Sequence, residues 1–140
     1  MSDEKLALSF REISEAIHRF RFPEVDFVIG IATGGIYPAL MIAHQLSVDF
    51  GFLHIHFRDP GNKPLYREPR LLWNPLENLD RSKRILLVDE VSVSGKTLEK
   101  AREILKGYDL QTFVLKGMGD LVLFPEIRSC VIWPWKTSQP

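Results

Sequence analysis

The sequence has 140 residues, of which 45% are apolar and 26% are charged, a composition that excludes a disordered chain. Lysine plus arginine balances aspartate plus glutamate at 18 each, so no net charge favours nucleic acid or an anionic membrane. The single cysteine, Cys130, excludes an intramolecular disulfide, and no apolar run approaches the ~20 residues of a transmembrane helix. The charged N-terminal segment does not resemble a signal peptide. We expect one cytoplasmic domain over residues 1–140.

The first two predicted elements are an amphipathic helix and a buried strand. Residues 3–20 predict a surface helix, capped by Asp3 or Ser2, because apolar side chains recur at three- and four-residue spacing. These side chains are Leu6, Phe10, Ile13, Ile17 and Phe20. The segment "VDFVIGI" at 25–31 predicts a strand with apolar side chains on both faces, which is typical of a parallel sheet.

The remaining elements alternate between strands and helices. In chain order they are a helix over 37–46 with Pro38 in its first turn, strands over 50–57 and 84–89, a helix over 97–106 ended by Gly107, and strands over 111–116 and 129–133. This alternation predicts an α/β fold, with a mainly parallel twisted sheet flanked by helices.

Residues 58–81 form a long segment with four prolines and no hydrophobic period. Loops longer than ~12–15 residues in a compact domain are usually functional or disordered. The segment is therefore either a solvated excursion or a lid over a binding site.

The stretch "ILLVDEVSVSGKTLEKA" at 85–101 indicates a ligand site. Asp89 and Glu90 end an apolar strand, and a turn rich in small and hydroxyl residues then leads into a helix, whose first N–H groups can bind phosphate. Carboxylates beside a phosphate suit ribose hydroxyls or Mg²⁺. The alternative is that the same residues form an ordinary polar turn with a helix N-cap and bind no ligand. A Walker A loop is excluded, because its first glycine would stand at Glu90.

A second strand, glycine turn and helix occurs in "GIATGGIYPALMIAHQL" at 30–46. Thr33, Gly34 and Gly35 could surround anion oxygens with their backbone amides. Two such turns at neighbouring strand ends could hold both ends of a ligand with two phosphate groups.

With these two segments, the sequence resembles the type I phosphoribosyltransferases. "LLVDEVSVSGKTL" is similar to the family signature, and "ATGGIYPALMIAHQL" is similar to its pyrophosphate-binding loop and helix. "FVLKGMGD" and "VIWPWK" resemble most closely the bacterial and archaeal xanthine/guanine/hypoxanthine enzymes.

The resemblance implies a fold with a minimal C-terminal hood and transfer of 5-phosphoribosyl from phosphoribosyl pyrophosphate (PRPP) to a purine-like base, with a 6-oxopurine favoured. It also implies Mg²⁺ and a homodimer, and neither nucleic acid nor membrane as a partner. Asp89 and Glu90 would be catalytic, holding the ribose hydroxyls directly or through Mg²⁺, and basic residues of 58–81 would close as a lid over pyrophosphate.

The resemblance also assigns three groups of binding residues. The 5-phosphate group comprises Val93, Ser94, Gly95, Lys96 and Thr97. The pyrophosphate group comprises Thr33, Gly34 and Gly35. The base group comprises Lys116, Ile132 and Trp133.

Four departures from the family pattern leave a second hypothesis open. Val93 stands where the oxopurine enzymes have an aspartate, Glu90 replaces a second aspartate, and Thr33 replaces a frequent basic residue. Cys130 and Val131 provide no ring where relatives place an aromatic. The alternative is a non-catalytic regulatory relative that binds PRPP or a nucleotide.

Overall fold

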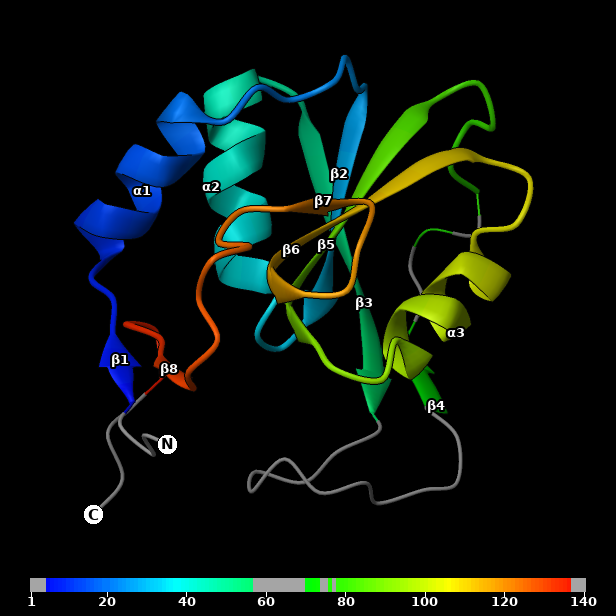
Figure 1. Ribbon diagram of the computed structural model, residues 1–140. Coiled ribbons are helices and arrows are strands. Elements are labelled where there is room, and N and C mark those ends of the chain that lie inside the picture. The colour runs from blue at the N-terminus through cyan, green and yellow to red at the C-terminus, as the bar shows by residue number, and fades with distance from the viewer. Residues whose placement is uncertain (1–4, 57–69, 74–75, 77, 137–140) are drawn as a thin grey trace.

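The computed structural model describes residues 5–56, 70–73, 76 and 78–136 (Figure 1). In chain order the elements are β1 (Leu6–Ala7), α1 (Phe10–Arg19), β2 (Phe27–Ala32), α2 (Ile36–Leu46), β3 (Asp49–His56), β4 (Arg70–Trp73), β5 (Arg84–Ser92), α3 (Lys96–Ile104), β6 (Asp109–Gly117), β7 (Leu121–Val122) and β8 (Val131–Ile132).

The main sheet has the strand order β4-β3-β2-β5-β6-β7. All neighbours in it are parallel except β4, which pairs antiparallel with β3 at the edge. Helices α1 and α2 lie on one side of the sheet and α3 lies on the other (Figure 1). The predicted α/β fold with a mainly parallel sheet is therefore confirmed.

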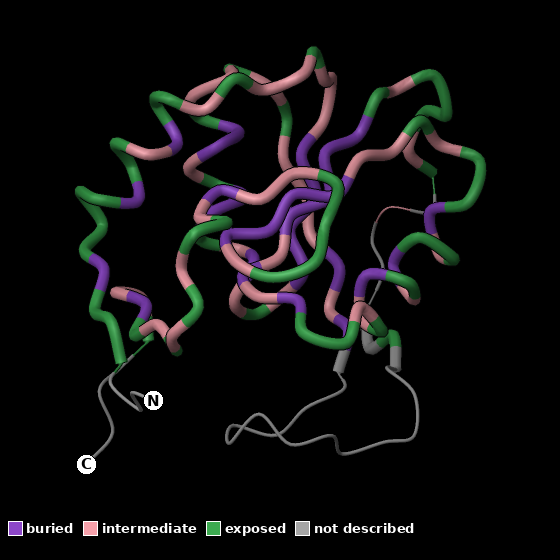
Figure 2. The backbone as a smooth tube through the Cα atoms, viewed as in Figure 1, coloured by how far each residue is buried: buried purple, intermediate pink, exposed green. Residues whose placement is uncertain are grey.

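The alternation of side chains along β5 shows how the core is divided. Leu86 and Val88 pack in the cluster that contains the buried residues of α1 and α2. Ile85 and Leu87 pack on the opposite face with the buried residues of α3. Both faces of β5 are covered, and Figure 2 shows the buried residues concentrated in the central strands. A strand buried on both faces reads as a continuous apolar run, as this one does.

Helix α1 begins later than the sequence pattern predicted. Ser9 caps it: its Oγ accepts a hydrogen bond from the Glu12 N–H at 3.0 Å, and the Glu12 carboxylate accepts from the Ser9 N–H at 2.9 Å. The prediction of a helix over 3–20 is thus wrong for its first turns, and the proposed caps Asp3 and Ser2 lie outside the described residues. A reciprocal capping box fixes the start of a helix more strongly than a continuing apolar period does.

The residues before α1 form a strand instead. β1 pairs in parallel with β8, with Leu6 opposite Val131. This small second sheet joins residues near both ends of the described chain, and Figure 1 shows it below α1, apart from the main sheet. The short strand predicted over 129–133 is confirmed as β8.

Two further strands, β4 and β7, were not predicted. β4 lies within the segment 58–81, most of which is outside the described residues, including the proposed lid residues Arg58, Lys63 and Arg67. Among the described residues, no helix is both long and apolar enough to cross a membrane.

Candidate active site

The parallel sheet brings the two predicted turns to one edge. β2 and β5 are neighbours in register, with Gly30 opposite Val88, and each runs directly into its turn. Helices α2 and α3 begin at this edge, at the C-terminal ends of their strands (Figure 1). In open α/β sheets this edge is where ligands bind.

Asp89 and Glu90 lie on β5 at this edge but point to opposite faces, because successive side chains on a strand alternate. Asp89 follows the parity of Ile85 and Leu87 and faces the α3 side. Its Oδ1 accepts a hydrogen bond from the Glu90 backbone N–H at 2.7 Å. The two carboxylates therefore do not form one side-by-side pair.

Desolvation, assisted by the nearby Glu90 carboxylate, raises the pKa of Asp89 to about 7 despite the opposing effects of the Glu90 N–H and Lys136. A carboxyl group that titrates near neutral pH is typical of a ligand or proton site at the end of a strand. Opposite charge from a bound cation would favour its ionised form.

Glu90 is buried, with 7% of its surface exposed. Its Oε2 accepts a hydrogen bond from Trp135 Nε1 at 2.6 Å, and its Oε1 lies 3.0 Å from Lys136 Nζ. Both carboxylate oxygens thus have partners in the C-terminal segment. No local sequence pattern predicted that this segment returns to the end of β5.

The turn between β5 and α3 leads directly into a helix N-terminus. Gly95 caps α3 with a left-handed backbone (φ +81°), and a Cβ added to it would meet nothing within 4 Å. The Lys96 N–H donates to Ser94 Oγ at 3.3 Å, and Val93 is exposed. The first N–H groups of a helix lack intrahelical acceptors, so the predicted 5-phosphate residues Val93 to Thr97 surround a helix N-terminus that can bind an anion.

The turn between β2 and α2 is packed more tightly. The Ala32–Thr33 peptide bond is cis. A Cβ on Gly35 would lie 2.6 Å from the carbonyl oxygens of Ile31 and Val88, so only glycine fits there. A Cβ on Gly34 would lie 2.7 Å from Glu90 Oε2, which places the predicted pyrophosphate turn directly against Glu90.

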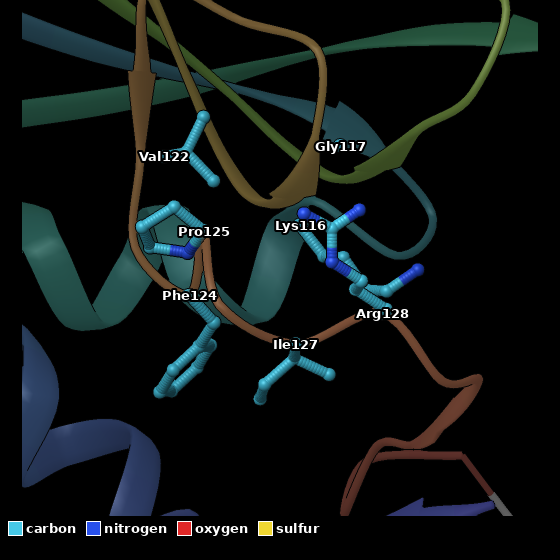
Figure 3. A pocket seen from close by; sticks show the side chains of 7 residues that line it. All are labelled: Lys116, Gly117, Val122, Phe124, Pro125, Ile127 and Arg128. Atoms are coloured by element: carbon cyan, nitrogen blue, oxygen red, sulfur yellow. The ribbon is translucent and has the colours of Figure 1, made fainter.

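A pocket of about 350 Å³ opens beside the end of β6 (Figure 3). Its lining residues come from β6, β7 and the segment that follows them: Lys116, Gly117, Val122, Phe124, Pro125, Ile127 and Arg128. Apolar walls with two cationic side chains suit a flat ring that carries hydrogen-bond acceptors. Lys116, which the sequence predicted to bind the base, is one of these lining residues.

The other two predicted base residues lie elsewhere. Trp133 is only 2% exposed and its ring is stacked on Trp135, with centroids 5.6 Å apart. Ile132 is 45% exposed and pairs with Ala7 in the small sheet. Neither lines the pocket, whereas Phe124 is among its lining residues and also packs against the core cluster.

Sequence reasoning missed Phe124 and Arg128, because the segment after β6 has no periodic pattern that reveals a fold. Asp120 anchors the start of this segment. Its Oδ2 accepts hydrogen bonds from the Thr112 N–H at 2.9 Å and from Arg102 at 2.6 Å. These bonds, with desolvation opposing them, lower the pKa of Asp120. The pocket wall is thereby tied to both β6 and α3.

The predicted Mg²⁺ ligands fit only in part. Mg²⁺ is usually bound by one or two carboxylates together with substrate phosphates and water. Asp89 suits this role, whereas both oxygens of Glu90 already have protein partners. Among the described residues, no three His, Cys, Asp or Glu side chains gather as a metal cluster. Asp89 would therefore be the protein ligand, and the metal would supply charge to the leaving phosphates.

The comparisons with known proteins agree with this arrangement. The chain is 33% identical over 68% of its length to an orotate phosphoribosyltransferase of Saccharolobus solfataricus, and 31% identical over 59% to the transcriptional regulator GfcR of Methanocella arvoryzae. It spans only 44% and 40% of those two proteins. A purine phosphoribosyltransferase structure from Pyrococcus horikoshii superimposes with a TM-score of 0.78 at 25% identity, covering 99% of this chain and 97% of that one.

The model of the phosphoribosyl transferase domain matches residues 3–139, which include both turns, Asp89 and the pocket. This match covers nearly the whole sequence, and it agrees with the edge geometry built up above. The chain belongs to the phosphoribosyl transferase domain family.

Proposed function

We propose that this protein transfers 5-phosphoribosyl from PRPP to a nucleobase and releases pyrophosphate. The observation that carries the proposal is the convergence, at one sheet edge, of two glycine-containing turns that lead into helices, the Asp89 carboxylate and a pocket at the end of β6. Residues 93–97 would bind the 5-phosphate, Asp89 the ribose hydroxyls, and residues 33–35 the pyrophosphate.

The chemistry of the transfer matches these positions. Bond cleavage at the anomeric carbon develops positive charge on the ribose and negative charge on the leaving pyrophosphate. With PRPP bound as proposed, the Asp89 carboxylate would face the sugar and the amides of the 33–35 turn would face the pyrophosphate, so each would oppose the developing charge it meets. Mg²⁺, bound through Asp89 and the ligand, would add charge stabilisation of the leaving group.

The pocket favours a base with oxo groups. Lys116 and Arg128 can donate hydrogen bonds but cannot accept them, so they suit the O6 edge of a 6-oxopurine and leave the adenine amino group without an acceptor. Five curated relatives are named for orotate, one for adenine and one for xanthine and guanine, so the choice of base rests on the two cationic side chains of the pocket. We therefore propose a 6-oxopurine as the acceptor.

A steady-state assay with guanine, hypoxanthine, xanthine, adenine, orotate and uracil tests this proposal. We expect pyrophosphate release with at least one 6-oxopurine, and slower turnover with adenine. Lys116→Met should raise the KM for base more than the KM for PRPP. Higher kcat/KM with orotate or adenine would reject the assignment of the base while keeping the transferase.

A regulatory role is the second candidate, because one relative is named as a transcriptional regulator and Val93 supplies no proton acceptor for the base. This protein would bind PRPP or a nucleotide without turning it over. Binding of PRPP with no product from any of the six bases would favour the regulator. Assembly as a homodimer remains a prediction from the family resemblance, and a cytoplasmic location remains a prediction from the sequence composition.

A further inference from the structure

Two residues of the C-terminal segment contact the two oxygens of the Glu90 carboxylate. Trp135 donates its indole N–H to Oε2 at 2.6 Å, and the Lys136 ammonium group lies 3.0 Å from Oε1. We call these three residues the Glu90 clasp. Since both oxygens are occupied and the residue is 7% exposed, Glu90 has little surface with which to reach a ribose.

The charge of Glu90 also fits a structural partner. A buried carboxylate without a counter-charge is costly, and Lys136 provides that charge from the protein itself. Glu90 points to the face of the sheet that carries Leu86 and Val88, away from the face of Asp89. The two acids therefore have different surroundings and different partners.

The clasp also touches the candidate pyrophosphate turn. Glu90 Oε2 lies 2.7 Å from the position that a Cβ on Gly34 would occupy, so the carboxylate packs on the backbone of the turn. Trp135 stacks on Tyr37, in the first turn of α2, with ring centroids 5.4 Å apart and planes inclined by 6°. Trp135 thus contacts both Glu90 and the start of the helix that follows the turn, whereas Lys136 contacts Glu90.

We propose that Trp135 and Lys136 are positioning residues: they hold Glu90 against the 33–35 turn, so that Glu90 shapes the turn and Asp89 alone binds the ribose. The inference rests on the proposed function, because it assumes that the turn binds the pyrophosphate of PRPP. It assigns different roles to two acids that the family resemblance treats together.

The test measures the dissociation constant of PRPP by titration calorimetry with Mg²⁺ present. Glu90→Gln keeps an acceptor for Trp135 but removes the ion pair, Lys136→Met removes the charge, and Trp135→Phe removes the N–H while keeping a ring on Tyr37. At metal sites, loss of the contacts that orient the ligands weakens binding roughly 10–100-fold. We expect each variant to bind PRPP about tenfold more weakly, in the range known for supporting contacts.

The combination of variants distinguishes positioning from direct binding. Glu90→Gln with Lys136→Met should be no weaker than either single variant, because both break the same ion pair. Lys136→Arg should restore affinity, and Asp89→Asn should weaken binding further in every background. Lys106→Met, just beyond the C-terminal end of α3, is the matched control for loss of one lysine. This variant should bind PRPP with wild-type affinity.

Three outcomes would overturn the proposal. A large loss in Glu90→Gln alone, with normal affinity in Lys136→Met and Trp135→Phe, would mean that Glu90 binds the ligand directly. Tighter binding in Lys136→Met would mean that the C-terminal segment blocks the site. Wild-type protein without affinity for PRPP would reject the proposed function and the positioning role together. In that case, unfolding midpoints of Glu90→Gln, Lys136→Met and the double variant would show whether the two side chains are coupled, and so whether the clasp itself forms.

Discussion

At the scale of single residues, the two acids at the end of β5 illustrate how neighbours in sequence acquire separate roles. Asp89 faces the α3 side with a pKa of about 7, whereas Glu90 faces the α1–α2 side and is held by Trp135 and Lys136. Strand parity alone predicts that they point apart. The partners of Glu90 could not be predicted, because they depend on where a distant segment returns.

The raised pKa of Asp89 has a consequence for stability. The folded protein keeps this carboxyl protonated up to about pH 7, whereas the unfolded chain releases the proton near its ordinary pKa of 3.8. Between these values the unfolded state binds fewer protons, so the free energy of unfolding falls as the pH rises. Urea unfolding at pH 5 and pH 7 should show a steeper fall for the wild type than for Asp89→Asn. Equal slopes would mean that Asp89 is not desolvated.

Two glycines of the site should respond differently to alanine. Gly35→Ala places a methyl group 2.6 Å from two backbone oxygens that cannot move aside, and should cost about 3 kcal/mol of stability, as overpacking does. Gly95→Ala meets no atom within 4 Å and should cost only the left-handed backbone strain of about 1 kcal/mol. Urea midpoints of the two variants provide the comparison. A larger loss in Gly95→Ala would contradict the packing of the 33–35 turn.

At the scale of elements, the long strands and helices were predictable and the short ones were not. β2, β5 and β6 carry continuous apolar runs, and α2 and α3 have glycine at their start or just after their end. Strands β1, β7 and β8 have two residues each, which is too few to show a hydrophobic period. Only β8 was predicted, from its apolar residues. Ser9 and Glu12 form a recognisable capping signature, so the true start of α1 was present in the sequence but masked by the longer apolar period.

The pairing of β1 with β8 can be tested by proline substitution. The Leu6 N–H donates to the Cys130 carbonyl at 2.9 Å and the Leu8 N–H donates to the Ile132 carbonyl at 3.2 Å, whereas the Ala7 N–H lies between these bonds. Leu6→Pro removes one bond of the ladder, and Ala7→Pro should remove none. Hydrogen exchange should show faster exchange at residues 131–136 in Leu6→Pro than in Ala7→Pro. Equal exchange in both variants would mean that β1 does not hold β8.

At the scale of the whole molecule, parallel topology explains why two turns far apart in sequence lie at one edge of the sheet. The order β2-β5-β6 puts three strand ends side by side, so a prediction of two βα units already implied one common edge. The pocket was only partly predictable. Lys116 could be predicted because it stands near the end of a strand. Phe124 and Arg128 could not, because they belong to a segment whose path depends on the hydrogen bond between Asp120 and Thr112.

Binding of PRPP should stabilise the whole fold whether or not a base is converted. A ligand at one hundred times its dissociation constant adds about 2.7 kcal/mol to the free energy of unfolding. For a domain of this size each kcal/mol raises the midpoint by roughly 2–8 °C, so a shift of several degrees is expected in thermal unfolding with Mg²⁺ and PRPP. Asp89→Asn should remove the Mg²⁺-dependent part of the shift. An unchanged shift in that variant would place the metal elsewhere.

The small sheet of β1 and β8 also sets an order of events during synthesis. A chain that leaves the ribosome from its N-terminus has all strands of the main sheet available before residues 131–132 appear, but Leu6 then still lacks its partner. Trp135 and Lys136 emerge later still, so the 33–35 turn exists for some time without Glu90 fixed beneath it. The nascent protein therefore completes its main sheet first and the contacts of Glu90 with Trp135 and Lys136 last.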